Sequence, residues 1–554
     1  MTQSFLPEKF AHPYEINPIF AKSVAYFSME FAIDQAFKIY SGGLGFLAGS
    51  HMRSAKALRQ NLCGIGILWT CGYYNQTRGD GHEMAVQFRR KHPAFLRETG
   101  LQFSIRIFDQ NVWVRALYLP GDVFATVPMF FLSTDLEENQ EFGRSITQRL
   151  YDSDQQLRIA QYMVLGLGGA RLLEELGVDP DVCHLNEAHG LSALFRAYER
   201  TRNKELVQKK FVFTTHTPEE SGNEKSNLYQ LQQAGFFGGV ELQEIRELID
   251  LRDDTFNHSL AALRMCHKAN AVSKLHGEVS RDMWKAYSGI CPIDHVTNAQ
   301  NKKYWVDPIL ETARLIGDPE MLKNRKRELK ERLFRIVADQ TGKLMDPEVM
   351  TIVWARRFAG YKRPDLITRD KQLFRELLSR NDMPVQIIWA GKPYPFDYGA
   401  IETFNNLINL TAPYPNASVL VGYELELSHN LKKGSDVWLN NPIVTREASG
   451  TSGMAAAMNA SVNLSTWDGW FCEFGKDGEN SFIVPPADAT SGETSRDLED
   501  LTNIYRILNN SICPLYYQNN EAWWEMAMRS MNDVTPQFDA DRMASEYYEK
   551  IYRS

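Results

Sequence analysis

Short apolar runs that alternate with amphipathic segments restrict the fold of this 554-residue chain more than any other feature. Four of these runs are rich in β-branched or aromatic side chains and are bounded by turn residues: 210–217 (KFVFTTHT), 349–355 (VMTIVWA), 384–391 (PVQIIWAG) and 417–422 (ASVLVG). A strand that is buried on both faces of a parallel sheet has this continuous apolar pattern. We therefore predict buried parallel strands in both halves of the chain.

Amphipathic segments separate the predicted strands. Residues 153–177 begin with Ser-Asp, carry recurring apolar positions and stop at a glycine, and residues 365–380 repeat the pattern after Pro364. Alternation of strands and helices in both halves predicts an α/β protein with two doubly wound domains. Open α/β sheets bind ligands at the carboxyl ends of their strands, so we expect two facing sheets with the site in the cleft between them.

The polar stretch 294–304 (DHVTNAQNKKY) separates the two alternating halves. We predict one domain over residues 1–293 and a second over residues 294–520. Residues 521–554 contain two further amphipathic segments, where we expect closing helices.

Composition and charge argue against several classes of function. The net charge is −8 and no dense run of Lys and Arg occurs, so a nucleic-acid partner is not expected. No window approaches about 18 uninterrupted apolar residues, and the first residues lack a basic stretch before an apolar core, so we expect neither a membrane span nor a signal peptide. The seven cysteines are dispersed without a CxxC pair, which indicates reduced thiols, a cytoplasmic protein and no metal site.

A glycine-rich turn near the start of the chain is the first candidate binding feature. Residues 41–49 (SGGLGFLAG) follow a strand-like run at 24–27 and lead into a helix-compatible segment. Glycines let backbone N–H groups approach an anion closely, and a following helix N-terminus adds a favourable dipole. A purely structural turn is the alternative interpretation.

The residues that follow the strand predicted at 349–355 carry a stronger signal. Arg357 and Lys362 lie at its carboxyl end, within WARRFAGYKRP (354–364). A guanidinium offers two parallel donors and an ammonium offers a point charge, a pair that suits a phosphate or diphosphate. The alternative is a solvated basic loop.

Two further features complete the candidate site. In residues 447–458, Glu447 precedes a Gly-Thr-Ser-Gly turn and a helix-forming AAAM run. The backbone amides of this turn can form an anion nest, and the carboxylate can accept bonds from sugar hydroxyls; a glutamate that caps its own turn is the alternative. The segments 184–190 (HLNEAHG) and 214–218 (TTHTP) place histidines at strand ends, where satisfied structural histidines are the alternative.

Together these segments resemble the α-glucan phosphorylases, in particular their shorter, divergent branch. Segments that match the family in order run along the chain: SGGLGFLAG, HLNEAHG, FTTHTPEE, VTNAQN, WARRFAGYKRP, IIWAGKPYP, GSDVWLNNP, EASGTSGM and FDADRMASEYY. The resemblance implies the GT-B architecture of two Rossmann-like domains that face an interdomain cleft, with the last helix crossing back to the first domain. It also implies a homodimer and retaining glucosyl transfer between α-1,4-glucan and phosphate, which forms glucose 1-phosphate.

The resemblance assigns roles to individual residues. Those implied to bind the sugar substrate are Gly42, Gly43, Leu44, Asn186, Asn298, Ser449 and Gly450. Those implied to be catalytic are His216, through its backbone carbonyl, the phosphate-binding pair Arg357 and Lys362, and the glucose-binding Glu447. Those implied to hold the cofactor phosphate are Thr451, Ser452 and Gly453.

Ala455 departs from the family pattern. The corresponding family residue is a lysine that holds pyridoxal phosphate as a Schiff base, and alanine has no amine to form that bond. Covalent attachment at Ala455 is therefore excluded, whereas tight non-covalent binding is not. The lysines nearest in sequence are Lys432, Lys433 and Lys476, and none stands in register to replace it.

Three functions follow from this pattern. The first is phosphorylase-like glucosyl transfer, with pyridoxal phosphate or without it. The second is transfer from a nucleotide-glucose, as in the related glycogen and starch synthases, although those carry a ribose-binding glutamate where Ala455 stands. The third is a glucan-binding relative without catalytic activity. Arg357, Lys362 and Glu447 favour the two enzymes, because a bare binding module needs no phosphate clamp.

Overall fold

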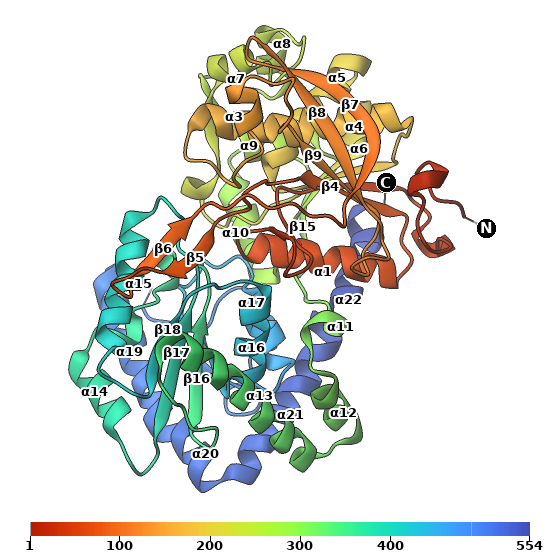
Figure 1. The fold of residues 1–554 in the computed structure, drawn as a ribbon. Coiled ribbons are helices and arrows are strands. Elements are labelled where there is room, and N and C mark those ends of the chain that lie inside the picture. The colour runs from red at the N-terminus through yellow and green to blue at the C-terminus, as the bar shows by residue number, and fades with distance from the viewer. Residues whose placement is uncertain (1, 489, 554) are drawn as a thin grey trace. The chain divides into compact units, whose positions relative to one another are not determined.

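The computed structural model describes residues 2–488 and 490–553, and these form two compact units. The first unit comprises Met1–Tyr74, Phe88–Asn298 and Ala540–Ser554, and the second comprises Asn75–Gln87 and Ala299–Asp539. Each unit contains a sheet of largely parallel strands with flanking helices, so the predicted α/β class with two doubly wound parts is confirmed (Figure 1). Among the described residues, no helix has the length and apolar character needed to cross a bilayer.

The first unit is built on a nine-stranded sheet of order β15-β14-β11-β10-β1-β4-β9-β8-β7. The strands from β15 to β9 pair in parallel, and β8 and β7 extend the β9 edge with antiparallel pairing. The strand bounds are β1 Val24–Phe27, β4 Leu62–Ile67, β7 Arg97–Ile107, β8 Gln110–Leu119, β9 Met129–Ser133, β10 Val182–Asn186, β11 Phe211–Thr214, β14 Lys268–Ala271 and β15 Ile293–His295. The strand predicted at 210–217 is confirmed as β11, which is buried along its length.

Helices cover this sheet, and two short antiparallel strand pairs extend the unit. One is a hairpin of β2 Phe31–Ala32 with β3 Lys38–Ile39, and the other pairs β12 Lys225–Asn227 with β13 Thr255–Asn257 across the helix-containing segment 228–254. The helices are α1 Gly43–Ala57, α2 Glu141–Ser145, α3 Gln155–Met163, α4 Gly169–Leu176, α5 Ser192–Thr201, α6 Lys204–Lys210, α7 Leu228–Ala234, α8 Leu242–Leu248, α9 His258–Met265, α10 Lys274–Trp284 and α22 Ala540–Glu546.

The helix predicted at 153–177 is present but is interrupted. Asp154 caps α3 by accepting a hydrogen bond from the amide of Leu157, and α4 ends at Gly177, whose φ of 68° favours glycine. A π-helical turn, Val164–Gly168, joins the two helices. At this turn a Cβ on Gly166 would lie 2.2 Å from the hydroxyl of Ser192, so the absence of a side chain lets α5 pack closely.

The second unit is built on a six-stranded parallel sheet of order β18-β17-β16-β19-β20-β21. Numbered along the chain, this order is 3-2-1-4-5-6, the Rossmann arrangement. The bounds are β16 Met350–Ala355, β17 Val385–Ala390, β18 Ala417–Leu420, β19 Val437–Asn440, β20 Val462–Thr466 and β21 Ser481–Val484. The strands predicted at 349–355, 384–391 and 417–422 are confirmed as β16, β17 and β18.

The helices of the second unit are α11 Lys302–Trp305, α12 Pro308–Ile316, α13 Pro319–Thr341, α14 Lys371–Ser379, α15 Tyr398–Thr411, α16 Leu425–Gly434, α17 Thr451–Ala457, α18 Phe471–Phe474, α19 Glu493–Ile507, α20 Cys513–Gln518 and α21 Asn520–Phe538. The helix predicted at 365–380 begins six residues later, as α14 at Lys371. Asp370 sets this start, because its carboxylate accepts hydrogen bonds from the amides of Gln372 and Leu373 at 2.9 and 3.0 Å.

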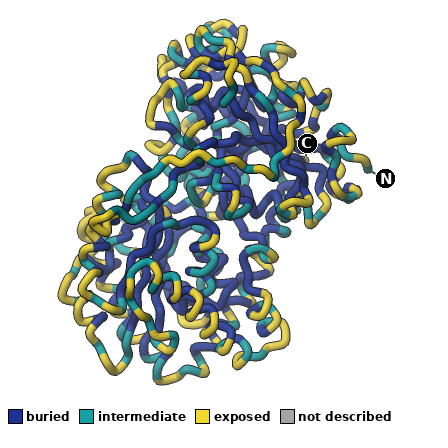
Figure 2. Tube along the Cα trace, viewed as in Figure 1, coloured by how far each residue is buried: buried dark blue, intermediate teal, exposed yellow. Residues whose placement is uncertain are grey.

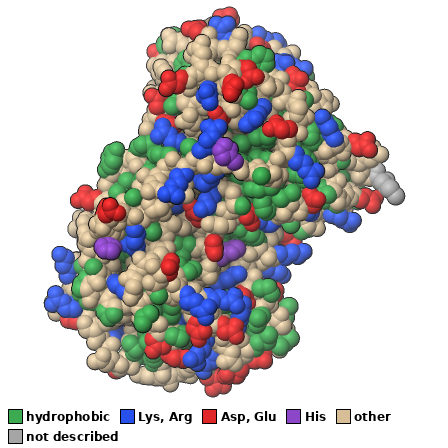
Figure 3. Space-filling model, in the orientation of Figure 1, with side chains coloured by type: hydrophobic (Ala, Val, Ile, Leu, Met, Phe, Trp, Pro, Cys, Tyr) green, Lys and Arg blue, Asp and Glu red, His purple; other side chains and the backbone are tan. Residues whose placement is uncertain are grey.

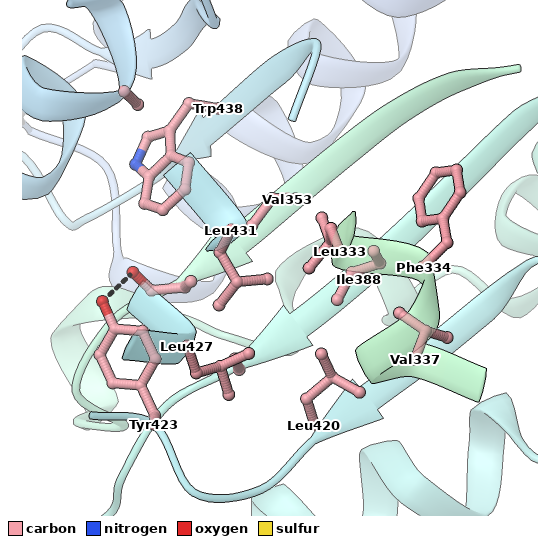
Figure 4. Packing of buried hydrophobic residues seen from close by; sticks show 13 residues of the cluster. Leu333, Phe334, Val337, Val353, Ile388, Leu420, Tyr423, Leu427, Leu431 and Trp438 are labelled. Atoms are coloured by element: carbon pink, nitrogen blue, oxygen red, sulfur yellow. Dashed lines mark hydrogen bonds between the residues drawn. The ribbon is translucent and has the colours of Figure 1, made fainter. Parts of the chain in front are cut away.

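A hydrophobic core joins α13 and α16 to the second sheet (Figure 4). Leu333 and Val337 of α13 pack in one cluster with Ile388 of β17 and Leu431 of α16. The burial pattern explains why the strand predictions succeed, since every residue of β16, β17, β18 and β19 is buried (Figure 2).

Three predicted domain limits differ from the structure. The first boundary follows Asn298 rather than residue 293, because β15 pairs with β14 and the amide of Asn298 bonds to the carbonyl of Val272 at 2.9 Å. The predicted closing segment 521–554 is divided, since α21 belongs to the second unit and residues from Ala540 onward belong to the first. In the first unit the hydroxyl of Tyr552 lies 2.7 Å from Nδ1 of His184.

The third difference is the hairpin of β5 Asn75–Arg78 and β6 Met84–Gln87, which belongs to the second unit although the predicted first domain includes it. The side chain of Gln76 attaches the hairpin through both ends of its amide. Its Nε2 donates to the carbonyl of Gly391 at 2.9 Å, and its Oε1 accepts from the amide of Gly422 at 3.0 Å. These backbone groups follow β17 and β18, so the hairpin caps the carboxyl edge of the second sheet.

Candidate active site

A buried glutamate between two cations forms the centre of the candidate site in the second unit. One Nη of Arg356 lies 2.5 Å from Oε2 of Glu447, and Nζ of Lys362 lies 2.8 Å from the same oxygen and 3.2 Å from Oε1. Arg356 follows β16, and Glu447 lies in the loop after β19. These neighbouring strands form the point where the strand order reverses, which is where open α/β sheets bind ligands.

The charges of this cluster determine how its acids titrate. Burial alone would raise the pKa of Glu447, but the charges and hydrogen bonds of Arg356 and Lys362 outweigh it and lower the pKa to about 2. Asp468 behaves in the opposite way, because burial raises its pKa to about 7. Its Oδ2 accepts a hydrogen bond from the amide of Glu447 at 3.0 Å, so Asp468 fixes the backbone of the loop that carries the glutamate.

Arg356 is a residue that the sequence interpretation missed. The predicted phosphate contact was Arg357, whose side chain is exposed, whereas Arg356 is 4% exposed and contacts Glu447. Both residues lie beyond the end of β16, so their burial in the folded chain, and not the motif spacing, distinguishes the two arginines.

Two polar atoms of the cluster point to a ligand. Nη1 of Arg356 and the hydroxyl of Ser449 are buried, and neither has a hydrogen-bond partner among the described residues. A buried polar group without a partner is costly and calls for an explanation. Gly450 joins Ser449 to the cluster, since a Cβ on Gly450 would lie 3.5 Å from Cγ of Glu447 and 3.6 Å from Nη2 of Arg356. An oxyanion or a sugar hydroxyl would satisfy both atoms.

The predicted cofactor nest lies at the start of α17. Thr451 is buried and Ser452 is half-buried, while Gly453 is packed against the protein interior. A Cβ on Gly453 would lie 2.6 Å from Oδ1 of Asn463 and 3.0 Å from the ring of Trp470, so this glycine is required by packing. Ala455 follows on the same helix and is fully buried.

The glycine-rich turn in the first unit surrounds a carboxylate that the sequence interpretation did not single out. Glu30 accepts hydrogen bonds from the amides of Ser41 and Gly42 at 2.6 and 3.3 Å, and from the hydroxyl of Tyr151 at 2.8 Å. Part of the predicted anion nest is therefore occupied by the protein's own side chain. Gly43 is exposed. Apart from its chain neighbours and the backbone of its own helix, no described residue has a heavy atom within 4 Å of the place where the Cβ of an alanine would lie.

A second network of the first unit lies where β1 and β10 meet. Nε2 of His216 lies 2.7 Å from Oδ1 of Asn186, whose Nδ2 donates to the hydroxyl of Ser28 at 3.1 Å. Glu187, which has a φ of 65°, accepts a hydrogen bond from the amide of His216 at 2.8 Å. Burial lowers the pKa of His216 to about 3 and raises the pKa of Glu187 to about 7. Such arrangements of shifted groups are typical of functional sites.

The other residues singled out from the sequence differ in burial and in their hydrogen-bond partners. Asn298 is buried, and its Oδ1 has no hydrogen-bond partner among the described residues. Leu44 is half-buried in the first turn of α1. His184 lies between the hydroxyls of Tyr552 and Thr214, each at 2.7 Å, so the structural alternative holds for this histidine. On the face visible in Figure 3, acidic and basic side chains are intermixed.

Comparison with known proteins identifies similar sequences. A family model described as Carbohydrate phosphorylase matches residues 306–496. An uncharacterized protein of Methanocaldococcus jannaschii is 45% identical over 96% of this chain and 100% of its own length. The maltodextrin phosphorylase of Thermococcus litoralis is 32% identical over 97% of this chain and 71% of its own length. The glycogen phosphorylase of Aquifex aeolicus is 31% identical over 96% of this chain and 86% of its own length.

Proposed function

Because this chain belongs to the carbohydrate phosphorylase family, whose fold is GT-B, we propose that it transfers glucosyl units between an α-1,4-glucan and phosphate. The product in the degradative direction is glucose 1-phosphate. The observation that carries the proposal is the buried cluster in which Arg356 and Lys362 enclose Glu447. The two cations face the single ionised carboxylate of Glu447, and charged donors of this kind suit a phosphate ligand.

The phosphate is held by groups that the cluster leaves available. Nη1 of Arg356 and the hydroxyl of Ser449 supply two donors, and Lys362 supplies a point charge. Arg357 remains a proposed phosphate contact from its exposed position. The carboxylate of Glu447 has further lone pairs beyond those used by the cations, so it can accept a hydrogen bond from a glucose hydroxyl.

Catalysis follows from charge placed beside the breaking glycosidic bond. The bound phosphate stabilises the positive charge of the oxocarbenium-like transition state. Dipoles that the fold already holds in place stabilise the same positive charge, because they need not reorient during the reaction. We assign one of these dipoles to the backbone carbonyl of His216. The residue is held in place because its Nε2 donates to Oδ1 of Asn186 and its amide donates to the carboxylate of Glu187. Gly42, Gly43, Leu44 and Asn298 are proposed to line the sugar.

Pyridoxal phosphate is the cofactor that this family normally uses. The start of α17 fits its phosphate, since no described side chain caps the first amides of this helix and they can donate to an anion. Thr451, Ser452 and Gly453 remain the proposed nest. When bound, the cofactor supplies a second phosphate that exchanges a proton with the substrate phosphate. Ala455 offers no amine, so the cofactor would be held in this nest without a covalent bond to position 455.

A pocket in the second unit supports the alternative in which the glucosyl donor is a nucleotide-glucose. A cavity of about 340 Å³ lies beside the carboxyl ends of β16 and β17, lined by residues that include Phe358, Gly360, Arg369 and Asp397. A nucleoside is of a size that such a pocket accepts. Transfer from a nucleotide-glucose is therefore the second candidate function, and glucan binding without turnover is an outcome of the same test.

The experiment offers the purified protein three donors in parallel. Maltodextrin with phosphate tests for glucose 1-phosphate, with and without added pyridoxal 5′-phosphate, and UDP-glucose or ADP-glucose with maltodextrin tests for release of the nucleoside diphosphate. Arg356→Met should lower phosphorolysis by about tenfold to a hundredfold, the loss of one charge-assisted contact. Release of nucleoside diphosphate without glucose 1-phosphate would assign the protein to the second function, and glucan binding without any turnover would assign it to the third.

Assembly and location complete the proposal. We propose a homodimer, as the family resemblance implies, and a cytoplasmic location, which the seven cysteine thiols support. Sedimentation of the purified protein at several concentrations tests the dimer, and a mass of one chain would contradict it.

A further inference from the structure

A buried arginine beside the candidate site has no role in the proposed function. Among the described residues the buried arginines are Arg264, Arg325, Arg356 and Arg363, and Arg363 is the least exposed of them at 2%. A guanidinium is always charged in proteins, and a buried charge is costly unless ion pairs and hydrogen bonds compensate for it. The partners of Arg363 therefore show what its burial achieves.

Arg363 connects a loop of the second sheet to a helix. Its Nε donates to the carbonyl of Asn441 at 2.9 Å, and its Nη2 donates to the carbonyl of Pro442 at 3.0 Å. Its Nη1 donates to Oδ1 of Asp497 at 2.7 Å, and Nη2 also donates to Oδ2 of Asp500 at 2.6 Å. Both carbonyls follow β19, and both carboxylates belong to α19. One guanidinium thus joins the loop after β19 to two acids of α19.

Further hydrogen bonds return from the loop after β19 to the segment that contains Arg363. Nδ2 of Asn441 donates to the carbonyl of Arg363 at 2.8 Å. The amide of Ile443 donates to the carbonyl of Tyr361 at 2.8 Å. The two segments are therefore tied together by hydrogen bonds in both directions.

These two segments carry charged residues of the candidate site. The segment 360–364 contains Lys362, and the segment 441–447 ends at Glu447, whose Oε2 lies 2.8 Å from Nζ of Lys362. A lysine carries a compact charge on a flexible stem, so the position of its ammonium depends on how firmly its backbone is held. The hydrogen bonds of Arg363 supply that constraint.

The backbone of Arg363 also depends on these contacts. Its φ is 49°, in the left-handed region that residues other than glycine rarely adopt. Such a conformation persists only where the surrounding structure holds it, and the four hydrogen bonds of the guanidinium do so. Neighbouring cations in the sequence thereby meet different partners, since Lys362 contacts Glu447 and Arg363 contacts α19.

We propose that Arg363 is a positioning residue of the site. It ties the segment of Lys362 to the segment of Glu447 and so holds the ammonium of Lys362 where the substrate phosphate binds. Its own guanidinium stays with the protein, because it donates to four protein groups. The inference rests on the proposed function, which assigns the phosphate to Lys362. The motif at 354–364 contains Arg363, but its spacing gives this residue no role.

The first measurement is the Michaelis constant for phosphate in maltodextrin phosphorolysis. Arg363→Met should raise this constant by about tenfold or more, as the loss of one charge-assisted phosphate contact does, and leave the Michaelis constant for maltodextrin unchanged. Arg325→Met is the matched control, because Arg325 is also buried and its ion-pair partners, Asp307 and Glu328, lie outside both segments. Its replacement should lower the stability and leave both Michaelis constants unchanged.

Hydrogen exchange tests the same inference without any substrate. Backbone amides within residues 360–364 and 441–447 should exchange faster in Arg363→Met than in the wild type, in both segments together. In Arg325→Met the same amides should exchange at the wild-type rate.

A milder variant serves where methionine at position 363 prevents folding. Arg363→Lys keeps the charge but lacks the fork that reaches two carbonyls and two carboxylates at once. It should change the exchange rates and the Michaelis constant for phosphate in the same direction as Arg363→Met, and by less.

The outcomes separate the inference from the proposed function. Unchanged exchange in the position-363 variants, an unchanged Michaelis constant for phosphate, or equal changes in Arg325→Met would overturn the inference and leave the function standing. A wild type that forms no glucose 1-phosphate would overturn the function, and faster exchange of both segments would then still support the connection that Arg363 makes.

Discussion

Replacing Arg356 by methionine tests the charge cluster through protein stability, with no substrate present. Burial alone would raise the pKa of Glu447, yet the neighbouring cations lower it from 4.5 to about 2. Lowering the pKa from 4.5 to about 2 corresponds to about 3 kcal/mol of folding free energy at pH 7. The Coulombic effect of Arg356 is the largest of the causes that lower this pKa, so we expect Arg356→Met to lower the free energy of unfolding by about 2–3 kcal/mol.

The assay is urea unfolding of the wild type, Arg356→Met and the matched variant Arg357→Met. The side chain of Arg357 is exposed, so its replacement should change the stability by less than about 0.5 kcal/mol. A lowered carboxyl pKa gives stability that is present above 4.5 and is lost as the pH falls toward about 2. The difference between the wild type and Arg356→Met should therefore shrink when the pH is lowered from 7 toward 3. Equal losses in the two variants, or a difference independent of pH, would refute the reasoning.

Three further predictions concern the second unit and the glycine-rich turn. Gln76→Ala should lower the free energy of unfolding by about 1–3 kcal/mol, because the carbonyl of Gly391 and the amide of Gly422 lose their partners. Residues 75–87 should then become sensitive to proteolysis, and an unchanged digestion pattern would contradict the prediction. Burial raises the pKa of Asp468 from 3.8 to about 7, so this group lowers the free energy of unfolding of the wild type progressively as the pH rises from 4 to 7. The urea midpoint of Asp468→Asn should lack this decline with pH. The same dependence of the midpoint on pH in both proteins would count against the prediction. Gly453→Ala should lower the melting temperature, because the new Cβ would lie 2.6 Å from Oδ1 of Asn463. Gly43→Ala should leave the melting temperature unchanged, because its Cβ would lie in open space. Equal melting temperatures of the two variants would refute the prediction.

The strands were predictable because burial on both faces leaves a continuous apolar run. The expected strand at 349–355 agrees with β16 within one residue. The helix expected at 365–380 starts later, at Lys371, because Asp370 caps it. Local patterns of this kind depend on neighbours in sequence. A pattern of apolar residues therefore gives element types well and helix starts less well.

The parts that the sequence did not reveal depend on contacts between distant residues. The hairpin at 75–87 is assigned to the second unit by the bonds of Gln76 to Gly391 and Gly422, more than three hundred positions away. Glu30 enters the glycine-rich turn by the same kind of long-range contact. Arg356 is buried against Glu447 whereas Arg357 is exposed, a difference that motif spacing does not show.

The most direct measurement follows the fate of phosphate itself. The purified protein is incubated with maltodextrin and isotopically labelled phosphate, and the sugar phosphates are separated. We predict that the label appears in glucose 1-phosphate, in an amount that depends on maltodextrin and falls in Arg356→Met. Label that stays in inorganic phosphate, with and without added pyridoxal 5′-phosphate, would contradict the assignment of this chain as a glucan phosphorylase.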